Sequence, residues 1–373
     1  MTTVHARRVF MKNTAAVLTA SAFPAITFAQ TAAPAERRFL PQPGNWRTFE
    51  VTTRVDILKP QGATRLWLPI PSVNTDWQQS LESSYSSNGK TEMTDDDQYG
   101  ARMLYVAYDA SEAKPFVELT SRIKTQNRAT DWTKKNVSAE DAATLKHWTQ
   151  PTSLLPTDGI VRKTAQEATR GAQTDVEKAQ KLYDWIVANT FREPTVKGCG
   201  EGDIKTMLET GNLGGKCADL NALFVGLCRS VGLPARDVYG LRVAPSAFGY
   251  KELGGNPASL KGAQHCRAEV YLKAHGWVGM DPADVAKVMR QETPEWIKSP
   301  KNALVAPVNK NLFGGWEGNW MAFNMAHDVN LPHSQGAKPG FFMYPMAENA
   351  SGRLNSYAPD DFKYQISARE TLT

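Results

Sequence analysis

Cysteine is scarce in this chain: 4 of 373 residues are cysteine. That number is too small for a disulfide scaffold of this size, and no pair has zinc-finger spacing. Outside residues 1–29 the sequence lacks a run of ~18 uncharged apolar residues, so we do not expect a transmembrane channel or transporter. An excess of charge is also missing. The formal net charge is +5, and Arg7, Arg8 and Lys12 in the first 29 residues account for three of these charges. We therefore expect neither nucleic acid nor an anionic membrane as a partner.

The composition that remains is that of a folded globular protein. Hydrophobic residues make up 41% and charged residues 22% of the chain, which is sufficient for a full buried core. At ~100–200 residues per domain, the length suggests two or three domains.

Residues 1–29 have the features of an export signal. Two adjacent arginines precede Lys12, an Ala- and Thr-rich segment follows, and a small-x-small sequence ends at Ala29. This pattern resembles a twin-arginine signal, and the alternative is a chance Arg-Arg pair in a general secretory signal. In both cases we expect the mature chain to begin near Gln30 or Pro34 and to reside in the periplasm.

The hydrophobic period divides the rest of the chain. Apolar residues alternate with polar ones from Arg47 onward and again at 64–69, 101–108 and 114–124, which indicates antiparallel strands. Helical spacing takes over from Ser138. We expect a flexible lead-in over 30–44, a β-sandwich over 45–137, a mixed domain over 138–300 and an extension with strands and an aromatic-rich segment over 301–373, with an α+β fold overall.

Cys217 is the first chemically suggestive residue. It follows Gly214 and Gly215 and begins an apolar helix that extends to about Val231. A thiol on the first turn of a helix has its pKa lowered by the helix dipole, and the unpaired first-turn N–H groups can receive an oxyanion. The alternative is that Cys217 is a small buried hydrophobic residue.

A β-hairpin downstream offers a partner for this thiol. The alternating segment Gln264–Leu272 begins with His265, a turn follows at His275-Gly276, and the returning segment ends at Asp281. Folding of the hairpin brings His265 close to Asp281. A carboxylate beside the imidazole would fix its tautomer and stabilise the imidazolium.

These motifs together resemble the transglutaminase-like superfamily, the circularly rearranged relatives of papain-like cysteine proteases. The resemblance rests on the Gly-Gly-x-Cys turn before an apolar helix, the His265-x-x-x-Glu-Val-Tyr strand and the Gly-Trp-Val-x-x-Asp-Pro segment that contains Asp281. It covers roughly 195–285 and implies a central helix packed on an antiparallel sheet. It further implies that Cys217 is the nucleophile, His265 the general acid and base, and Asp281 the residue that orients the imidazole.

Two positions depart from the family pattern. Ala218 stands where the calcium-dependent cross-linking enzymes usually have Trp, and no acidic calcium loop is evident. We therefore expect no metal and no cofactor, and hydrolysis of amide bonds rather than cross-linking. Arg267 occupies a strand position that is often aromatic, from which we expect a cleft that accepts an acidic partner.

Several alternatives stay open from the sequence. The substrate would be a peptide or protein, but a protein-glutamine acyltransferase and a non-catalytic binding or assembly module on the same fold are rivals, and the oligomeric state is unknown. Cys199 and Cys266 form either a disulfide or two separate thiols, whereas Cys228 is expected in the core. The aromatic segment 313–323 either packs in the core or lines the cleft, and we favour the core.

Overall fold

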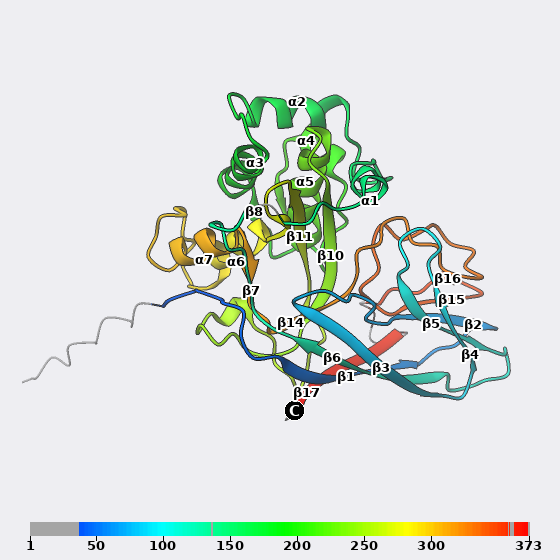
Figure 1. Ribbon diagram of the computed structural model, residues 1–373. Coiled ribbons are helices and arrows are strands. Elements are labelled where there is room, and N and C mark those ends of the chain that lie inside the picture. Colours follow the sequence, from blue (N-terminus) through cyan, green and yellow to red (C-terminus); the bar gives the residue numbers. More distant parts are fainter. Residues whose placement is uncertain (1–36, 136, 357, 359–361, 372–373) are drawn as a thin grey trace, which may run out of the picture. The chain divides into compact units, whose positions relative to one another are not determined.

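A computed structural model describes residues 37–135, 137–356, 358 and 362–371 (Figure 1). The export signal expected over residues 1–29 lies outside this part of the chain. Within it, no helix is long and apolar enough to cross a membrane.

Two antiparallel sheets contain the N-terminal strands. In the first sheet the order is β17-β1-β6-β3, and in the second it is β16-β15-β2-β5-β4. The first sheet consists of β1 (Arg47–Ile57), β3 (Gln78–Ser87), β6 (Phe116–Thr125) and β17 (Phe362–Thr371). The second consists of β2 (Thr64–Pro69), β4 (Lys90–Asp95), β5 (Arg102–Tyr108), β15 (Met346–Asn349) and β16 (Gly352–Arg353). Strands from the C-terminal extension therefore complete both sheets, and the sandwich arrangement itself stays a prediction.

A third antiparallel sheet supports the candidate site. Its strand order is β12-β11-β10-β14, and it comprises β10 (Ala235–Arg242), β11 (Gln264–Leu272), β12 (Gly276–Met280) and β14 (Trp320–Asn324). Helix α5 (Cys217–Ser230) packs on β10 and β11. Because every residue of α5 except Ser230 is buried, this helix is central to the fold and can hold its first residue in a fixed position.

The other helices surround α5 and extend the core. Figure 1 shows α2, α3 and α4 beside α5, and α6 also contacts it. A capping box between Thr174 and Glu177 begins α3, and Gly211 with a φ of 69° ends α4. The helices of the described chain other than α5 are α1 (Ala142–His147), α2 (Gly159–Ala168), α3 (Asp175–Asn189), α4 (Ile204–Thr210), α6 (Pro282–Gln291) and α7 (Ala306–Asn311).

Short elements join these parts. Strand β8 (Phe191–Arg192) pairs in parallel with β9 (Gly214–Gly215), and β7 (Arg128–Ala129) pairs with β13 (Gly315–Trp316). A 3₁₀ turn spans Lys251–Leu253. The β8–β9 pair fixes the backbone just before Cys217 and so contributes directly to the site.

The aromatic segment packs in the core, as the sequence indicated. Trp316 and Trp320 are each 1% exposed, and their rings lie edge to face with centroids 5.8 Å apart. Trp77 from the loop before β3 contacts both rings. Trp320 belongs to β14 of the third sheet, and its indole N–H donates to the carbonyl of His265 in β11 of the same sheet.

Candidate active site

The backbone around Cys217 is held by one carboxylate. Asp219, in the first turn of α5, accepts a hydrogen bond from the N–H of Lys216 at 2.8 Å and from the N–H groups of Glu201 and Gly202 at 2.9 Å each. Asp219 therefore ties the Gly-rich loop to the start of the helix. A Cβ at Gly215 would lie 2.5 Å from the Cβ of Asp219, so the glycine before the Lys-Cys pair is needed for this close approach.

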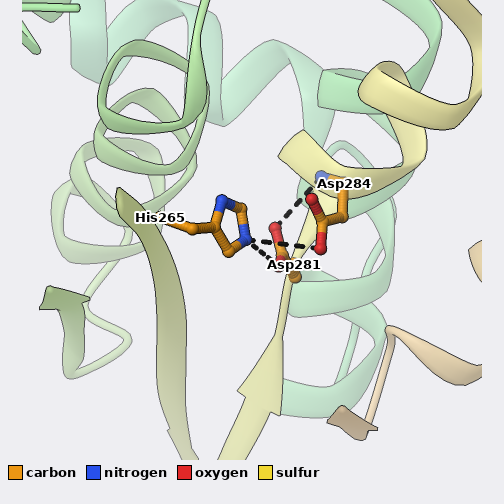
Figure 2. A group of neighbouring side chains, drawn as sticks. All are labelled: His265, Asp281 and Asp284. Atoms are coloured by element: carbon orange, nitrogen blue, oxygen red, sulfur yellow. Dashed lines mark hydrogen bonds and ion pairs between the residues drawn. The ribbon is translucent and has the colours of Figure 1, made fainter. Parts of the chain in front are cut away.

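The structure brings His265 and Asp281 together. His265 is at the beginning of β11 and Asp281 follows β12, and the antiparallel register of the two strands places both at the same end of the hairpin. Nε2 of His265 lies 2.7 Å from Oδ2 of Asp281 (Figure 2). The other ring nitrogen, Nδ1, is then the one available to the Cys217 thiol, which lines the same pocket as the ring.

Asp281 is itself held in place on several sides. It is the N-cap of α6, where it accepts a hydrogen bond from the N–H of Asp284 at 3.1 Å. The Asn221 amide of α5 donates to the same oxygen, Oδ1, at 3.2 Å, and Nε of Arg267 lies 3.5 Å from Oδ2. Asp281 is fully buried, so these contacts define its position and that of the imidazole.

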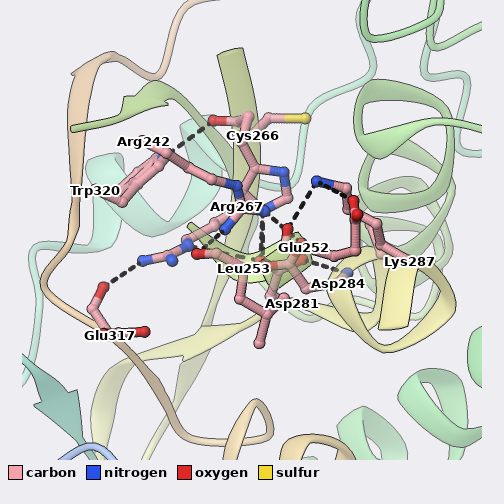
Figure 3. Close-up of polar contacts among 12 residues, drawn as sticks. Arg242, Glu252, Leu253, Cys266, Arg267, Asp281, Asp284, Lys287, Glu317 and Trp320 are labelled. Carbon is pink, nitrogen blue, oxygen red and sulfur yellow. Dashed lines mark hydrogen bonds and ion pairs between the residues drawn. The ribbon is translucent and has the colours of Figure 1, made fainter. Parts of the chain in front are cut away.

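A second carboxylate reaches the same imidazole. Oδ2 of Asp284 lies 3.3 Å from Nε2 of His265, and Arg242 donates to Oδ1 of Asp284 at 2.5 Å (Figures 2 and 3). The sequence analysis missed both residues. The signal for Asp284 was its spacing, because residues three apart at the start of a helix lie on the same face. No local pattern indicated Arg242.

These charges shift the pKa values of the reacting groups in opposite directions. Burial alone would lower the pKa of His265, but Asp284 and Asp281 outweigh burial and the opposing charge of Arg242, and they raise it to about 9. Burial would raise the pKa of the Cys217 thiol, but hydrogen bonds from Cys199, Cys266 and His265 bring it well below its usual value. The site therefore favours a thiolate–imidazolium pair at neutral pH.

The two carboxylates differ in their environments. Burial and the neighbouring Asp284 raise the pKa of Asp281. Despite burial, Arg242 and His265 hold the pKa of Asp284 well below its ordinary value. Asp284 is thus the carboxylate that keeps its charge most firmly beside the imidazolium.

Three thiols meet at the site. Cys199 and Cys266 both help to lower the pKa of the Cys217 thiol, Sγ of Cys199 donates to the carbonyl of Gln264 at 3.2 Å, and all four cysteines of the chain are free. The Tyr344 hydroxyl, from the C-terminal extension, donates to Sγ of Cys199 at 3.0 Å. The structure thus has Cys199 and Cys266 as separate thiols that stabilise the thiolate, while Cys228 is buried deeper in α5, as expected.

Arg267 lies in the interior rather than in the cleft, which corrects the expectation from the sequence. Its side chain is 2% exposed, its guanidinium lies over the rings of Trp316 and Trp320, and Nη1 donates to the carbonyl of Glu317 (Figure 3). Burial lowers the pKa of Arg267 to about 10, so it stays charged at neutral pH. Its role is to hold Asp281.

A pocket of about 220 Å³ opens onto the sulfur and the imidazole. Cys217 and His265 are each only 3% exposed, and both line this pocket. The lining residues come from β8, α5, β10, the loop before β11, the start of β11 and α6: Arg192, Cys217, Arg242, Gly254, Gly255, Asn256, Ser259, Lys261, Gly262, Ala263, Gln264, His265 and Lys287.

The same cluster has the spacing of a metal site. In the described part of the chain, His265, Asp281 and Asp284 are the one group of three whose ligand atoms lie close enough, within 4.8 Å of one another. However, Arg242 and Arg267 already contact the two carboxylates and supply the positive charge that a cation would bring. The donor set fits a hydrogen-bonded triad better than a metal centre.

Known proteins are similar to this chain in sequence. The sequence model of the "Transglutaminase-like superfamily" matches residues 162–282. An uncharacterized protein of Haemophilus influenzae is 33% identical over 384 residues, which cover 96% of this chain and 100% of that protein. YebA, an uncharacterized protein of Bacillus subtilis, is 26% identical over 241 residues, 62% of this chain and 30% of that protein.

The fold has a counterpart among solved structures. A crystal structure described as a "putative cysteine protease" from Cytophaga hutchinsonii matches 90% of this chain and 94% of its own, with a TM-score of 0.53 and 16% identity. A central helix that begins with a cysteine and packs on an antiparallel sheet is a transglutaminase-like, papain-related fold. The chain belongs to the transglutaminase-like superfamily.

Proposed function

We propose that this protein is a periplasmic cysteine-nucleophile enzyme that hydrolyses amide bonds of peptides or proteins through a thioester. The observation that carries the proposal is that Cys217 and His265 line the same pocket and that Nε2 of this His265 ring lies 2.7 Å from Asp281. This order of groups is what nucleophilic acyl transfer requires. The periplasmic location rests on the leader sequence.

The first half of the reaction forms the thioester. The Cys217 thiolate attacks the amide carbonyl carbon, and the carbonyl electron pair moves onto oxygen. When the tetrahedral intermediate collapses, the C–N bond breaks and Nδ1 of the His265 imidazolium gives its proton to the leaving amine. Asp281 and Asp284 keep the imidazolium oriented and charged until that transfer.

From the sequence we expected the unpaired N–H groups of the first turn of α5 to receive the oxyanion, but two backbone N–H groups beside Cys217 already have acceptors. The N–H of Ala218 already donates to the carbonyl of Cys199 at 2.9 Å, and that of Lys216 donates to Asp219. We assign the oxyanion contact to the N–H of Cys217 itself, since it belongs to the same residue as the attacking sulfur.

The second half releases the acyl group. Neutral His265 takes a proton from water, the hydroxide oxygen attacks the thioester carbon, and the C–S bond breaks to restore the thiolate. An amine in place of water would give acyl transfer, the reaction of the rival acyltransferase function. The small pocket and the 3% exposure of Cys217 favour the smaller acceptor, water.

Acyl-enzyme trapping tests this proposal. The protein is mixed with a peptide library or with activated p-nitrophenyl esters, quenched in acid and examined by intact mass. We expect an acyl adduct on Cys217, lost in Cys217→Ala, and faster decay of the adduct in water than its capture by a primary amine. Full turnover by Cys217→Ala would refute the assignment, and preferential capture by the amine would favour the acyltransferase.

A further inference from the structure

The pocket in front of Cys217 is lined by cations and by no carboxylate. Besides His265, four of its lining residues, Arg192, Arg242, Lys261 and Lys287, are basic, and no lining residue is an aspartate or glutamate. A cavity of about 220 Å³ holds roughly one side chain, so these charges face whichever group of the substrate lies beside the reacting carbonyl.

Two of the four cations are already neutralised. Arg242 donates to Asp284 at 2.5 Å, and Lys287 lies 3.3 Å from Oε2 of Glu252 (Figure 3). Their positive charge belongs to the internal ion network and offers little to a ligand.

The other two have no such partner. Within the described residues, no carboxylate forms an ion pair with Arg192 or Lys261. Arg192 is half-buried at the end of β8, and only its Nε is engaged, with Oε1 of Gln291 at 3.0 Å. Lys261 is exposed, and its ammonium lies 5.2 Å from the ring centroid of Tyr364.

A third side chain in the pocket lacks an acceptor. Gln264 is 5% exposed, and its Oε1 accepts from the N–H of Gly262 at 2.9 Å. Its Nε2 is buried and finds no hydrogen-bond acceptor among the described residues. A buried donor without an acceptor is costly, and an oxygen-bearing ligand in the pocket would satisfy it.

We infer that the substrate carries a carboxylate next to the scissile amide, and that Arg192, with Lys261 at the rim, selects it. This inference rests on the proposed function for the bond that is cleaved, but the selection of charge belongs to the pocket itself. A planar guanidinium with free Nη groups binds a carboxylate through two parallel hydrogen bonds. The carboxylate would come from an acidic side chain or from a chain terminus.

A pair of alkylating reagents tests the pocket without any substrate. Iodoacetate and iodoacetamide transfer nearly isosteric groups to the same thiolate and differ in one negative charge. Their rate ratio at Cys217 therefore cancels the thiolate fraction and reports the electrostatic preference of the pocket. We expect Arg192→Gln to lower the iodoacetate-to-iodoacetamide ratio roughly threefold to tenfold at low ionic strength, with a smaller effect for Lys261→Gln.

Matched controls separate charge from folding. Arg192→Lys should restore most of the ratio. Lys197→Gln removes an exposed lysine that lines the neighbouring cavity rather than this pocket, and it should leave the ratio unchanged. Because Lys261 is exposed, its variant keeps the fold even if Arg192→Gln does not. An unchanged ratio in Lys261→Gln and in a folded Arg192→Gln would overturn the inference.

Peptide pairs connect the pocket to turnover. Peptides with Glu or Gln beside the scissile bond, each with a free or amidated C-terminus, are compared by kcat/KM and by binding to Cys217→Ala. We expect about a tenfold preference for the carboxylate, abolished in Arg192→Gln. If amides are cleaved without charge preference, the inferred selection of a carboxylate fails while the proposed function stands. If charge preference persists in alkylation and binding but no amide is cleaved, the proposed function fails and the pocket's selectivity stands.

Discussion

Asp284 and His265 form an ion pair in which Oδ2 lies 3.3 Å from Nε2, in addition to the bond between His265 and Asp281. The imidazole thus faces two carboxylates from one helix turn. Two buried arginines, Arg242 and Arg267, balance their charge. The active site is one element of a buried ion network rather than an isolated triad.

Replacement of Asp284 should weaken the imidazolium without removing the triad. In Asp284→Asn, the pKa of His265 falls because the charged carboxylate 3.3 Å from Nε2 is gone, and the midpoint for alkylation of Cys217 rises. We expect kcat/KM to fall about tenfold to a hundredfold, which is less than the roughly 10²–10⁴-fold of complete general acid–base catalysis because Asp281 still orients the imidazole. Arg242 loses its partner, which costs about 3 kcal/mol of stability. Chemical denaturation and the pH profile of alkylation measure both effects.

Asp237→Asn is the matched control for this change. Asp237 is fully buried in β10, where burial raises its pKa to about 7, and its nearest ion-pair partner is His327 at 3.5 Å rather than His265. The Cys217 thiolate contributes to the raised pKa of Asp237, so removal of this carboxylate should leave the alkylation midpoint of Cys217 unchanged or lower it, whereas Asp284→Asn should raise it. Equal effects of the two variants would argue against a specific role for Asp284.

The pH dependence of stability separates the two members of the ion pair. The pKa of His265 is about 9 in the folded protein and ~6.5 when unfolded, so its stabilisation is complete below pH ~6.5 and is lost as the pH rises through about 9. Folding lowers the pKa of the Cys217 thiol, so the folded protein releases a proton from this thiol. Between pH ~6.5 and about 9, that release offsets the proton that His265 retains. The wild-type free energy of unfolding should therefore vary little with pH from this pair.

Removal of the thiol should expose the His265 contribution. In Cys217→Ala the folded state holds one more proton than the unfolded state, so the free energy of unfolding should fall by ~1.4 kcal/mol per pH unit between pH ~6.5 and ~9. Urea titrations at several pH values provide the measurement. Parallel slopes in the wild type and the variant would mean that Cys217 releases no proton on folding, which would contradict a thiolate–imidazolium pair.

The neighbouring thiol should tune the nucleophile. Cys199→Ala removes a donor to the Cys217 sulfur, and a hydrogen bond to a charged group contributes about 1.5 kcal/mol or more. The alkylation midpoint should rise by about one pH unit. Cys228→Ala makes the same chemical change deeper in α5 and should lower stability without moving the midpoint; an equal shift in both variants would contradict the thiol–thiolate contact.

A glycine in the loop should prove essential for a steric reason. Gly200 has a φ of +90°, and a Cβ there would lie 1.8 Å from Oδ2 of Asp219. We expect Gly200→Ala to displace Asp219, loosen the start of α5 and lower both stability and turnover by more than backbone strain alone. Gly232→Ala, at φ +80° with no atom within 4 Å, should cost only about 1 kcal/mol. Thermal unfolding compares the two, and similar losses would count against the Asp219 contact.

The sequence predicted those parts of the molecule whose causes are local. The hairpin that contains His265 follows from strand alternation and a His-Gly turn, and helix α5 follows from its apolar residues. Strands β3 and β4 escaped notice because they are largely polar and exposed, so no apolar alternation marks them.

The interactions around the site are long-range, and the sequence could not give them. Arg242 reaches Asp284 across 42 positions, and Arg267 lies under two tryptophans about 50 positions downstream. The position of Cys199 beside Cys217 depends on the path of the Gly-rich loop, which Asp219 fixes. Each of these contacts is set by tertiary packing rather than by local residue order.

The most direct test of Cys217 as an ionised nucleophile is the pH dependence of its alkylation by iodoacetamide in the folded protein, measured by mass spectrometry of the modified peptide. We expect Cys217 to react fastest of the four cysteines, with a midpoint of its alkylation well below pH ~8.5. A slow Cys217 that titrates at ~8.5 or above would contradict it and would favour a non-catalytic module.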